Sequence, residues 1–371
     1  MEKVKILATD GFEQEGVEIL KKAGFQVTES ATLPPEKLSE VIPEYDVLIV
    51  RSATKVPAEV IQRGSRLKII GRAGVGLDNI DINAATACGV IVMNAPEGNT
   101  ISAAEHTIGL LLAMARKIPQ ANASVKAGLW EKKKFMGTEL YGKTLGVIGL
   151  GRIGRRVAFI ARGLGMKVLA HDPFVGQETV KETEISLVSL EGLLKQADFV
   201  TLHLPLTDKT RGLINEQTLA LMKEGAGIIN VARGGIIDEA ALYQALCQGK
   251  LGAAALDVFE KEPLPQDSPL RSLDNVILTP HLGASTHEAQ VNVARDLATQ
   301  IVDAFTRKVI RNAVNLPAAE GEVLEKLRGY LSVGEHLGCL VRQLAEGDFK
   351  SVYLEYSGEI TNYDVSLLRL S

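Results

Sequence analysis

Residues Lys143–Pro173 read KTLGVIGLGRIGRRVAFIARGLGMKVLAHDP, and this stretch decides the fold. An apolar run of strand length, Thr144–Ile148, is followed by the glycine turn GLGRIG at 149–154. A helical stripe of apolar residues comes next, and a second apolar run, Lys167–Ala170, ends at Asp172. A glycine triplet alone indicates only a loop, but a triplet between a strand and a helix predicts a βαβ unit that binds a dinucleotide.

Each position of the turn has a physical role in such a site. Gly149 permits the tight turn, Gly151 lets a pyrophosphate approach the backbone, and Gly154 lets the helix pack closely on the strand. The unpaired N–H groups at the helix N-terminus then face the phosphates. Asp172 can accept hydrogen bonds from the ribose hydroxyls and repel a 2′-phosphate, and the following Pro173 offers such a phosphate no cation. The stretch therefore predicts a site for NAD rather than NADP.

The composition is that of a soluble globular protein with two domains or slightly more. The chain has 371 residues, 46% of them hydrophobic, and a net charge of −4, which argues against a nucleic-acid partner. Its three cysteines are far apart and form neither a disulfide framework nor a metal site, as is typical of a reducing compartment. No signal peptide or membrane-spanning run is recognisable. We therefore expect a cytoplasmic protein with no metal and no membrane partner.

Strands alternate with helices through residues 1–98, which predicts a parallel, doubly wound sheet. The expected strands are Val4–Ala8, Gln26–Glu29, Val47–Val50, Lys68–Ile70 and Val90–Met93, and the expected helices are Gly16–Lys22, Pro35–Val41, Ala58–Arg63 and Asn83–Ala87. The first turn of this half, DGFE at 10–13, places two acids where phosphates would lie, so this half should not bind a dinucleotide. The loop Gly71–Gly76 exposes its backbone after a strand and suits a small anion such as a carboxylate, unless it is a plain turn.

The second half repeats the alternation with six expected strands. These are Thr144–Ile148, Lys167–Ala170, Phe199–Leu204, Gly227–Val231, Ala253–Val258 and Val276–Leu278. The expected helices lie within Leu187–Ala197, beginning near Ser189, and at Asn215–Met222 and Glu239–Gln248. Long helices at Ile101–Lys117 and Ser285–Phe305 are expected to join the two halves. In the first of them, His106 is interpreted as a packed or hydrogen-bonded residue.

The predicted fold class is therefore α/β, with two doubly wound parallel-sheet domains. A flavodoxin-like substrate domain, discontinuous in sequence, takes residues 1–98 and 285–316, and a Rossmann domain takes residues 99–284. Residues 317–371 contain an expected helix, Val323–Leu344, and an alternating strand, Ser351–Ser357. This segment is expected to be an incomplete C-terminal domain, either a fragment or a docking arm.

Three polar residues follow expected strands of the second half, at the edge where open α/β sheets bind ligands. Arg233 offers a fork of donors that matches a carboxylate, and His281 titrates in the range needed to exchange a proton with a hydroxyl. Glu262 could fix the tautomer of that imidazole and raise its pKa. Asp257 is placed to hold a nicotinamide carboxamide. Each residue alone has an ordinary structural explanation, but their recurrence at three strand ends predicts a catalytic site.

The motifs that contain these residues resemble those of the D-2-hydroxyacid dehydrogenase family. They are GLGRIG at 149–154, NVARGG at 230–235, LDVFEKEP at 256–263 and TPHLGAST at 279–286. Four more segments resemble the members that act on a phosphorylated substrate: LIVRSATKV at 48–56, GRAGVGLDNID at 71–81, NAPEGNTISAAEHT at 94–107 and WEKKKFMGTEL at 130–140. The resemblance covers roughly residues 3–315.

The resemblance implies roles for individual residues. Arg233 would bind the substrate carboxylate, His281 would be the acid/base and Glu262 its partner. The expected cofactor residues are Gly149, Gly151, Arg152, Ile153, Gly154, Asp172, Pro205, Val231, Ala232, Asp257 and Gly283. The expected substrate residues are Arg51, Ser52, Arg72, Gly74 and Lys132.

The implied reaction is NAD-dependent oxidation of 3-phospho-D-glycerate to 3-phosphohydroxypyruvate, the first step of L-serine synthesis. One alternative is a reductase of another 2-keto acid, such as hydroxypyruvate or glyoxylate. A second alternative is a non-catalytic NAD(H)-sensing scaffold like the corepressors that share this fold. The helix Ile101–Lys117 and the region of Trp130 are expected to form a contact in a homodimer or tetramer.

Overall fold

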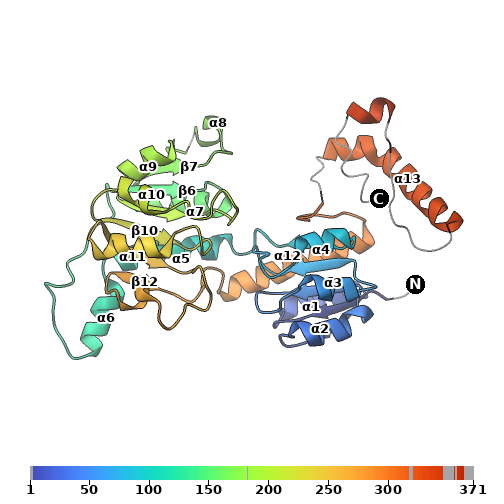
Figure 1. The fold of residues 1–371 in the computed structure, drawn as a ribbon, viewed down its shortest axis with the longest axis horizontal. Helices are drawn as coiled ribbons and strands as arrows, with labels where there is room; N and C mark the ends of the chain where they lie inside the picture. Colours follow the sequence, from blue (N-terminus) through green and yellow to red (C-terminus); the bar gives the residue numbers. More distant parts are fainter. Residues whose placement is uncertain (1–2, 182, 317–320, 346–354, 356, 363–371) are drawn as a thin grey trace. The chain divides into compact units, whose positions relative to one another are not determined.

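The computed structural model describes residues 3–181, 183–316, 321–345, 355 and 357–362 (Figure 1). The chain divides into two compact units. Unit 1 is formed by Met1–Pro96 together with Val293–Ser371, and unit 2 by Glu97–Asn292. The fold class is confirmed, because each unit contains a parallel sheet with helices on both faces.

Unit 1 has a five-stranded parallel sheet with the strand order β2-β1-β3-β4-β5. The strands are β1 (Lys5–Ala8), β2 (Gln26–Glu29), β3 (Val47–Val50), β4 (Ile69–Arg72) and β5 (Ile91–Asn94). The order reverses between β1 and β3, and ligands bind beyond the carboxyl ends of strands at such a point. The loops after β1, β3 and β4 therefore lie side by side at the carboxyl ends of the strands, next to this reversal point.

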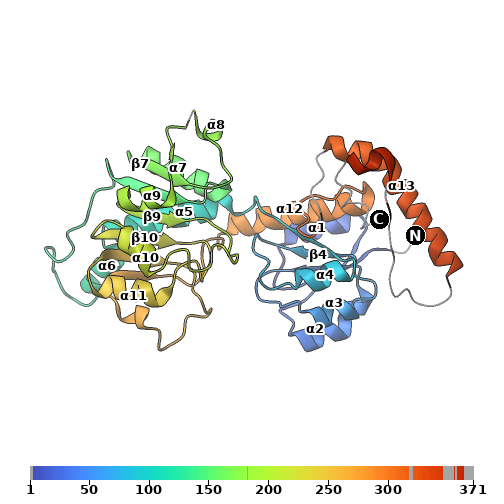
Figure 2. The ribbon, with the colours of Figure 1, turned by 45° about the horizontal axis from the view of Figure 1, so that its top comes forward.

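Alternation along the strands assigns each side chain of unit 1 to one of two cores. In β3, Val47 and Ile49 pack with α1 (Gln14–Lys22), whereas Leu48 and Val50 pack with α2 (Pro35–Val41), α3 (Ala58–Arg63) and α4 (Ile82–Ala87). Figure 2 shows α1 and α12 on one side of this sheet and α2 and α3 on the other. Because both faces are buried, all four residues of β3 are apolar.

Helix α12 (His287–Thr306) runs across the boundary between the units at 292/293. Beyond the boundary it buries a stripe at helical spacing against the sheet of unit 1, formed by Val293, Ala294, Leu297, Ala298 and Ile301. After the helix, residues 312–315 bond to the edge strand β5, where the Val314 N–H donates to the Val92 carbonyl. This return is the physical reason that unit 1 is discontinuous in sequence.

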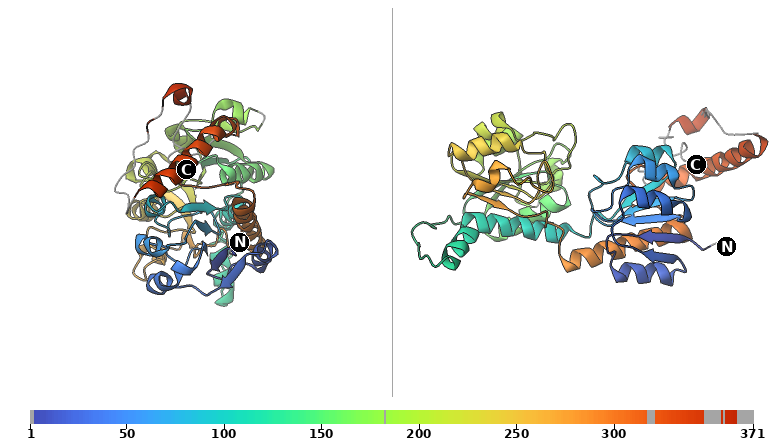
Figure 3. Two further views of the ribbon diagram at one scale, coloured as in Figure 1. Left: turned by 90° about the vertical axis from the view of Figure 1, so that its right-hand side faces the viewer. Right: turned by 60° about the horizontal axis from the view of Figure 1, so that its bottom comes forward.

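Unit 2 has a seven-stranded parallel sheet with the order β12-β11-β10-β9-β6-β7-β8. The strands are β6 (Thr144–Ile148), β7 (Lys167–His171), β8 (Ser186–Leu187), β9 (Phe199–Leu202), β10 (Ala226–Asn230), β11 (Leu251–Leu256) and β12 (Val276–Leu278). One face packs on α5 (Thr100–Ala115) and α7 (Arg152–Gly163), and the other on α9 (Leu190–Gln196), α10 (Glu216–Leu221) and α11 (Glu239–Cys247). The right-hand view in Figure 3 shows α5 (teal) and α11 (yellow) on opposite sides of the sheet.

The expected count of six strands in this half is wrong, because β8 adds a seventh. It has only two residues and pairs with β7 through Leu169 and Ala170. The helix predicted within Leu187–Ala197, with its start near Ser189, is confirmed as α9: Ser189 is its N-cap and Leu190 its first residue, while Leu187 lies in β8. A two-residue strand has no periodicity of its own, and pairing with its neighbour alone defines it.

The predicted helix Ile101–Lys117 is also too long. Helix α5 ends at Ala115, and Lys117 adopts a left-handed backbone conformation with φ 51°. A separate helix, α6 (Ile118–Lys126), starts there with Pro119 in its first turn, where a proline is tolerated. The break thus falls where the apolar run ends, at the charged residues Arg116 and Lys117.

The remaining elements are short except for one. They are α8 (Gln177–Val180), α13 (Gly321–Leu344) and the 3₁₀ helices η1 (Ile42–Glu44), η2 (Pro269–Ser272) and η3 (Gly358–Asn362). The predicted helix Val323–Leu344 is confirmed as α13, and the predicted strand Ser351–Ser357 lies mostly outside the described residues. Within the part of the chain that the structure describes, no helix combines the length and the apolar character needed to cross a bilayer.

We expect Leu297→Ala to destabilise unit 1 by about 2–5 kcal/mol, because the side chain is fully buried between α12 and the sheet. The measurement is urea unfolding followed by circular dichroism. Thr299→Ala, at an exposed position of the same helix, should change the free energy of unfolding by less than about 0.5 kcal/mol. Equal effects from the two substitutions would contradict the packing of α12 on this sheet.

Candidate active site

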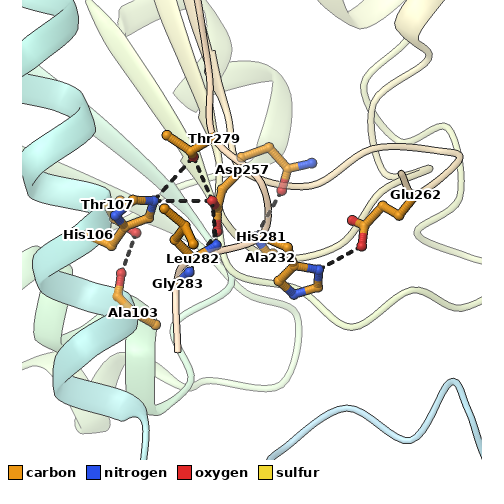
Figure 4. Close-up of polar contacts among 11 residues, drawn as sticks. Ala103, His106, Thr107, Ala232, Asp257, Glu262, Thr279, His281, Leu282 and Gly283 are labelled. Carbon is orange, nitrogen blue, oxygen red and sulfur yellow. Dashed lines mark hydrogen bonds and ion pairs between the residues drawn. The ribbon is translucent and has the colours of Figure 1, made fainter. Parts of the chain in front are cut away.

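Three loops of unit 2 follow the adjacent strands β10, β11 and β12. Because these strands are parallel, the three loops meet at the end of the sheet where the strands have their carboxyl ends, which we call the sheet edge. They contain Arg233, Glu262 and His281, respectively. Figure 4 shows the Glu262 carboxylate facing the His281 ring, with Asp257 behind the histidine loop. The structure thus brings together three motifs that lie far apart in the sequence.

The His281 imidazole and the Glu262 carboxylate are in direct contact. Nδ1 of His281 lies 2.8 Å from Oε2 of Glu262, while Oε1 of Glu262 accepts a hydrogen bond from the Phe259 N–H. The hydrogen bond that the His281 Nδ1–H donates to the Glu262 carboxylate raises the pKa of His281, against the opposing effects of burial and of the Arg233 charge. Burial alone would raise the pKa of Glu262, but the hydrogen bond and charge of His281 lower it below its ordinary value. The pair therefore favours an ionised glutamate and a readily protonated imidazole.

Arg233 extends from a loop that is fixed by its own residues. The buried Asn230 amide donates to the Arg233 carbonyl and accepts from the Ala232 N–H, and Nη1 of Arg233 donates to the Ala232 carbonyl. Gly234 lies against the Phe259 carbonyl so closely that a Cβ would overlap it. Glycine at this position therefore allows the arginine loop to stack on the loop that holds Glu262. The charge of Arg233 lowers the pKa of His281, in keeping with their shared site.

Asp257 organises the histidine loop from beneath. Its fully buried carboxylate accepts hydrogen bonds from the Leu282 and Gly283 N–H groups, each at 2.8 Å, and from the Thr279 hydroxyl at 2.6 Å. Burial alone would raise the pKa of Asp257, but these bonds and one from His106 lower it. The carboxylate is thus occupied by the protein itself, and the prediction that it holds a nicotinamide carboxamide stays a prediction.

His106 and Thr279 complete this network, and sequence patterns did not identify them as part of the site. Nε2 of His106 lies 3.2 Å from Oδ1 of Asp257 and 3.3 Å from the Thr279 hydroxyl (Figure 4). The interpretation of His106 as a hydrogen-bonded residue is confirmed. The only available signal was its position in an apolar helix, which indicates burial but not a partner.

The backbone at His281 is itself unusual, with φ 56° in the left-handed region. For a non-glycine residue this conformation costs about 1–2 kcal/mol. The His281 N–H donates to the Asp257 carbonyl at 2.8 Å, and the next two N–H groups are held by the Asp257 carboxylate. These bonds offset the strain and turn the imidazole toward Glu262.

The glycine turn has the geometry that a dinucleotide requires. Gly149 has φ 92°, and a Cβ there would overlap the His203 carbonyl, while a Cβ at Gly154 would overlap the Gly149 carbonyl. A Cβ at Gly151 would meet only open space, and Gly151 is the N-cap of α7, which has no side-chain cap. Two glycines are thus required by packing, and the third leaves room over the N–H groups of the helix N-terminus.

Asp172 lies at the end of β7 and braces the turn. Its Oδ2 accepts from the Leu150 N–H at 2.8 Å and its Oδ1 from the Phe174 N–H at 2.9 Å, so each oxygen keeps a further lone pair for a ribose hydroxyl. A pocket of about 360 Å³ adjoins it, lined by Asp172, Val175, Gly176, Gln177, Leu187, Val188 and Ser189. The prediction that Asp172 binds the ribose of NAD stays a prediction.

The other expected cofactor residues of unit 2 lie around the same sheet edge. The exposed Arg152 pairs with Glu97 at 3.1 Å, and the half-buried Ile153, in the first turn of α7, packs against the core of unit 2. Pro205 accepts a hydrogen bond from the Thr210 hydroxyl through its carbonyl. Val231 faces Gly283, where a Cβ would lie 2.8 Å from Cγ1 of Val231. Close contact between the loops after β10 and β12 therefore requires Gly283 to be a glycine.

Four of the expected substrate residues lie in unit 1, at the carboxyl ends of the neighbouring strands β3 and β4. Arg51 is half-buried and Ser52 is exposed directly after β3, and Arg72 ends β4 opposite Val50. Gly74 has φ 148°, and a Cβ there would overlap the Arg72 guanidinium, so glycine lets that side chain lie across the loop. The structure thus brings these four together in unit 1.

Lys132, the fifth expected substrate residue, lies in the exposed connection between α6 and β6. Among the described residues, no hydrogen bond or ion pair connects it to the Arg233, Glu262 or His281 loops. Its assignment to the substrate stays a prediction.

Comparisons with known proteins agree with this geometry. Residues 108–283 match the family model described as "D-isomer specific 2-hydroxyacid dehydrogenase, NAD binding domain". The chain is 53% identical over 97% of its length to a D-3-phosphoglycerate dehydrogenase of Synechocystis sp. and 51% identical over 99% to one of Methanocaldococcus jannaschii. It spans 64% and 70% of the length of these two relatives.

A solved structure gives the same answer. The D-lactate dehydrogenase of Aquifex aeolicus, in complex with NAD and lactic acid, superposes with a TM-score of 0.73 and 32% identity, covering 84% of this chain and all of that one. Sequence relatives, the family model and the fold therefore agree on the family. The chain belongs to the D-isomer specific 2-hydroxyacid dehydrogenase family, and it carries that family's NAD-binding domain.

Proposed function

We propose that the protein oxidises 3-phospho-D-glycerate to 3-phosphohydroxypyruvate with NAD, at the entry to L-serine synthesis. The observation that carries the proposal is the 2.8 Å contact between His281 and Glu262 beside Arg233, within an NAD-binding domain. The choice of substrate is supported by the relatives at 53% and 51% identity, both named D-3-phosphoglycerate dehydrogenase.

The residues of unit 2 divide the chemistry between them. Nε2 of His281 takes the proton of the substrate's C2 hydroxyl, because Nδ1 is engaged by Glu262. Glu262 stabilises the imidazolium that forms, and Arg233 binds the substrate carboxylate through two N–H groups. Bound NAD, held by the glycine turn and Asp172, supplies the acceptor for the C2 hydride.

The residues of unit 1 bind the charged ends of the substrate. Arg51, Ser52 and Arg72 offer donors beyond adjacent strand ends, and Gly74 makes room for the Arg72 guanidinium to lie across its loop. Lys132 adds positive charge for the phosphate. Recognition of two anionic groups explains why the preferred substrate is a phosphorylated acid rather than a simple 2-hydroxy acid.

We further propose that two copies associate through the α6 region and that the enzyme acts in the cytoplasm. Large apolar side chains are exposed on and after this helix, among them Ile118, Val125, Leu129, Trp130, Met136 and Tyr141. Trp130 is 85% exposed, and so many exposed apolar side chains in one region are typical of an interface.

The proposed cytoplasmic location is supported by the three cysteines, which are free, as is typical of proteins in a reducing compartment.

The proposed substrate is tested by comparing kcat/KM for 3-phosphoglycerate with that for unphosphorylated D-glycerate and D-lactate. We expect a preference of at least about 100-fold for the phosphorylated acid, because charge-assisted hydrogen bonds contribute about 1.5–3 kcal/mol each. Equal efficiency with all three would remove the phosphate-specific part of the proposal. A protein that binds NADH but turns over none of them would be a sensor rather than an enzyme.

Replacing the proposed acid/base, His281→Asn, should lower kcat by about 10²–10⁴-fold, because a positioned general base contributes that much. NADH affinity, measured by fluorescence titration, should stay within about twofold. The matched control is His336→Asn, on the exposed face of α13, which should leave both quantities unchanged. Undiminished turnover in His281→Asn would show that another group transfers the proton.

The raised pKa of His281 gives the reaction a direction-dependent pH profile. Oxidation needs the neutral imidazole, so its kcat/KM should rise with pH to a plateau above the raised pKa, whereas reduction should fall over the same interval. Glu262→Gln removes the main cause of the raised pKa and should move the midpoint of both profiles to lower pH. An unmoved or higher midpoint would contradict the assigned coupling.

A further inference from the structure

The loop after β3 in unit 1, residues Arg51–Thr54, is held through its backbone by side chains from elsewhere in the chain. Oδ2 of Asp10 accepts hydrogen bonds from the Arg51 N–H at 2.9 Å and the Thr54 N–H at 3.0 Å. Oδ1 of Asp10 accepts from the Thr54 hydroxyl at 2.6 Å. A single carboxylate thus binds both ends of the loop.

Asn79 holds the same two residues through their carbonyls. Its Nδ2 donates to the Arg51 carbonyl at 2.8 Å and to the Thr54 carbonyl at 2.7 Å. The N–H and C=O groups of both residues are therefore bound, while Ser52 and Ala53 between them are exposed. Asp10 and Asn79 together fix the position from which Ser52 and the Arg51 side chain extend.

Asp10 reaches this loop because of its place in the sheet. It follows β1, the neighbour of β3, and Thr9 is tied to β3 through its N–H and hydroxyl, both donating to the Ile49 carbonyl. Asp10 adopts φ 62°, a conformation that aspartate and asparagine tolerate better than most residues. The acidic turn, which the sequence predicts to be unsuited to a dinucleotide, thus has a structural role in holding this loop.

Asp10 cannot contribute to substrate binding by electrostatic attraction, because it carries the same negative charge as the proposed substrate. Burial alone would raise its pKa, but hydrogen bonds from Thr54, Thr32 and Arg51 lower it, so the carboxylate is ionised at neutral pH. A negative charge beside an anion-binding loop repels the substrate. Its contribution to binding must therefore come from geometry, and a misplacement of about 1 Å in a positioning group can cost about 100-fold in rate.

We propose that Asp10 and Asn79 are positioning residues, which clamp the backbone of Arg51–Thr54 so that Arg51 and Ser52 meet an anionic group of the substrate. This assignment rests on the proposed function, in which Arg51 and Ser52 bind the substrate. Neither Asp10 nor Asn79 touches the substrate itself. They act through the loop, and their loss displaces Arg51 and Ser52 without removing them.

The test compares two variants that release the loop from opposite sides, Asp10→Gly and Asn79→Ala. Glycine is chosen at position 10 because it adopts φ 62° without strain. Each variant should raise the KM for 3-phosphoglycerate by about 10–100-fold. The KM for NAD should stay within about twofold and kcat should fall less than the KM rises. An unchanged substrate KM in both variants would overturn the proposal.

Two controls separate positioning from charge and from stability. Asp10→Asn keeps an acceptor and tolerates the backbone conformation but loses the charge, so it should stay nearer to wild type than Asp10→Gly. Asp46→Ala removes a buried carboxylate at the opposite end of β3, where Asp46 accepts from the Lys5 N–H at 3.0 Å. It should destabilise the protein without changing the substrate KM. An equal rise in KM in Asp46→Ala would show that general destabilisation explains the effect.

Amide hydrogen exchange gives a readout that does not depend on activity. In Asp10→Gly the Arg51 and Thr54 amides should exchange faster, while those of β3 and β4 keep their protection. Unchanged exchange at Arg51 and Thr54 would overturn the clamp itself. If the clamp variants exchange faster but Arg51→Ala leaves the substrate KM at the wild-type value, the failure belongs to the proposed substrate contact and not to the clamp.

Discussion

The buried carboxylate of Asp257 is the constraint on which the catalytic edge depends. A fully buried charge is tolerated only when hydrogen bonds replace its water, and here the Leu282 and Gly283 N–H groups, the Thr279 hydroxyl and His106 do so. Satisfying that charge forces the chain after β12 into a tight turn with His281 at φ 56°. The hydrogen bonds that stabilise the buried Asp257 carboxylate thus also orient the His281 imidazole toward Glu262.

Side-chain carboxylates and amides bind the backbone of loops at other strand ends of both units as well. Asp172 accepts two N–H groups and braces the glycine turn, Asn230 fixes the arginine loop, and Asp10 with Asn79 fixes the loop after β3. Loops that expose N–H groups and cations to anionic ligands would otherwise be flexible. A carboxylate or amide behind each loop supplies acceptors for its inward N–H groups, which leaves the outward donors for the ligand.

Glycines determine how closely these loops approach one another. A Cβ at Gly234 would overlap the Phe259 carbonyl, and a Cβ at Gly154 would overlap the Gly149 carbonyl. Stacking of the arginine loop on the glutamate loop brings Arg233 close enough to lower the pKa of His281, against the raising effect of Glu262. The pKa of His281 therefore depends on the backbone contacts that place the loops as well as on the charges of Glu262 and Arg233.

The sequence by itself determined the fold class, the glycine turn with Asp172, and the three strand ends that hold Arg233, Glu262 and His281, because periodicity, glycine spacing and family motifs are local signals. It did not determine β8, the pairing of Asp257 with His106, or the clamp by Asp10 and Asn79. Each of these depends on partners distant in the chain. The tertiary structure decided them, because only the folded sheet brings those partners within hydrogen-bonding distance.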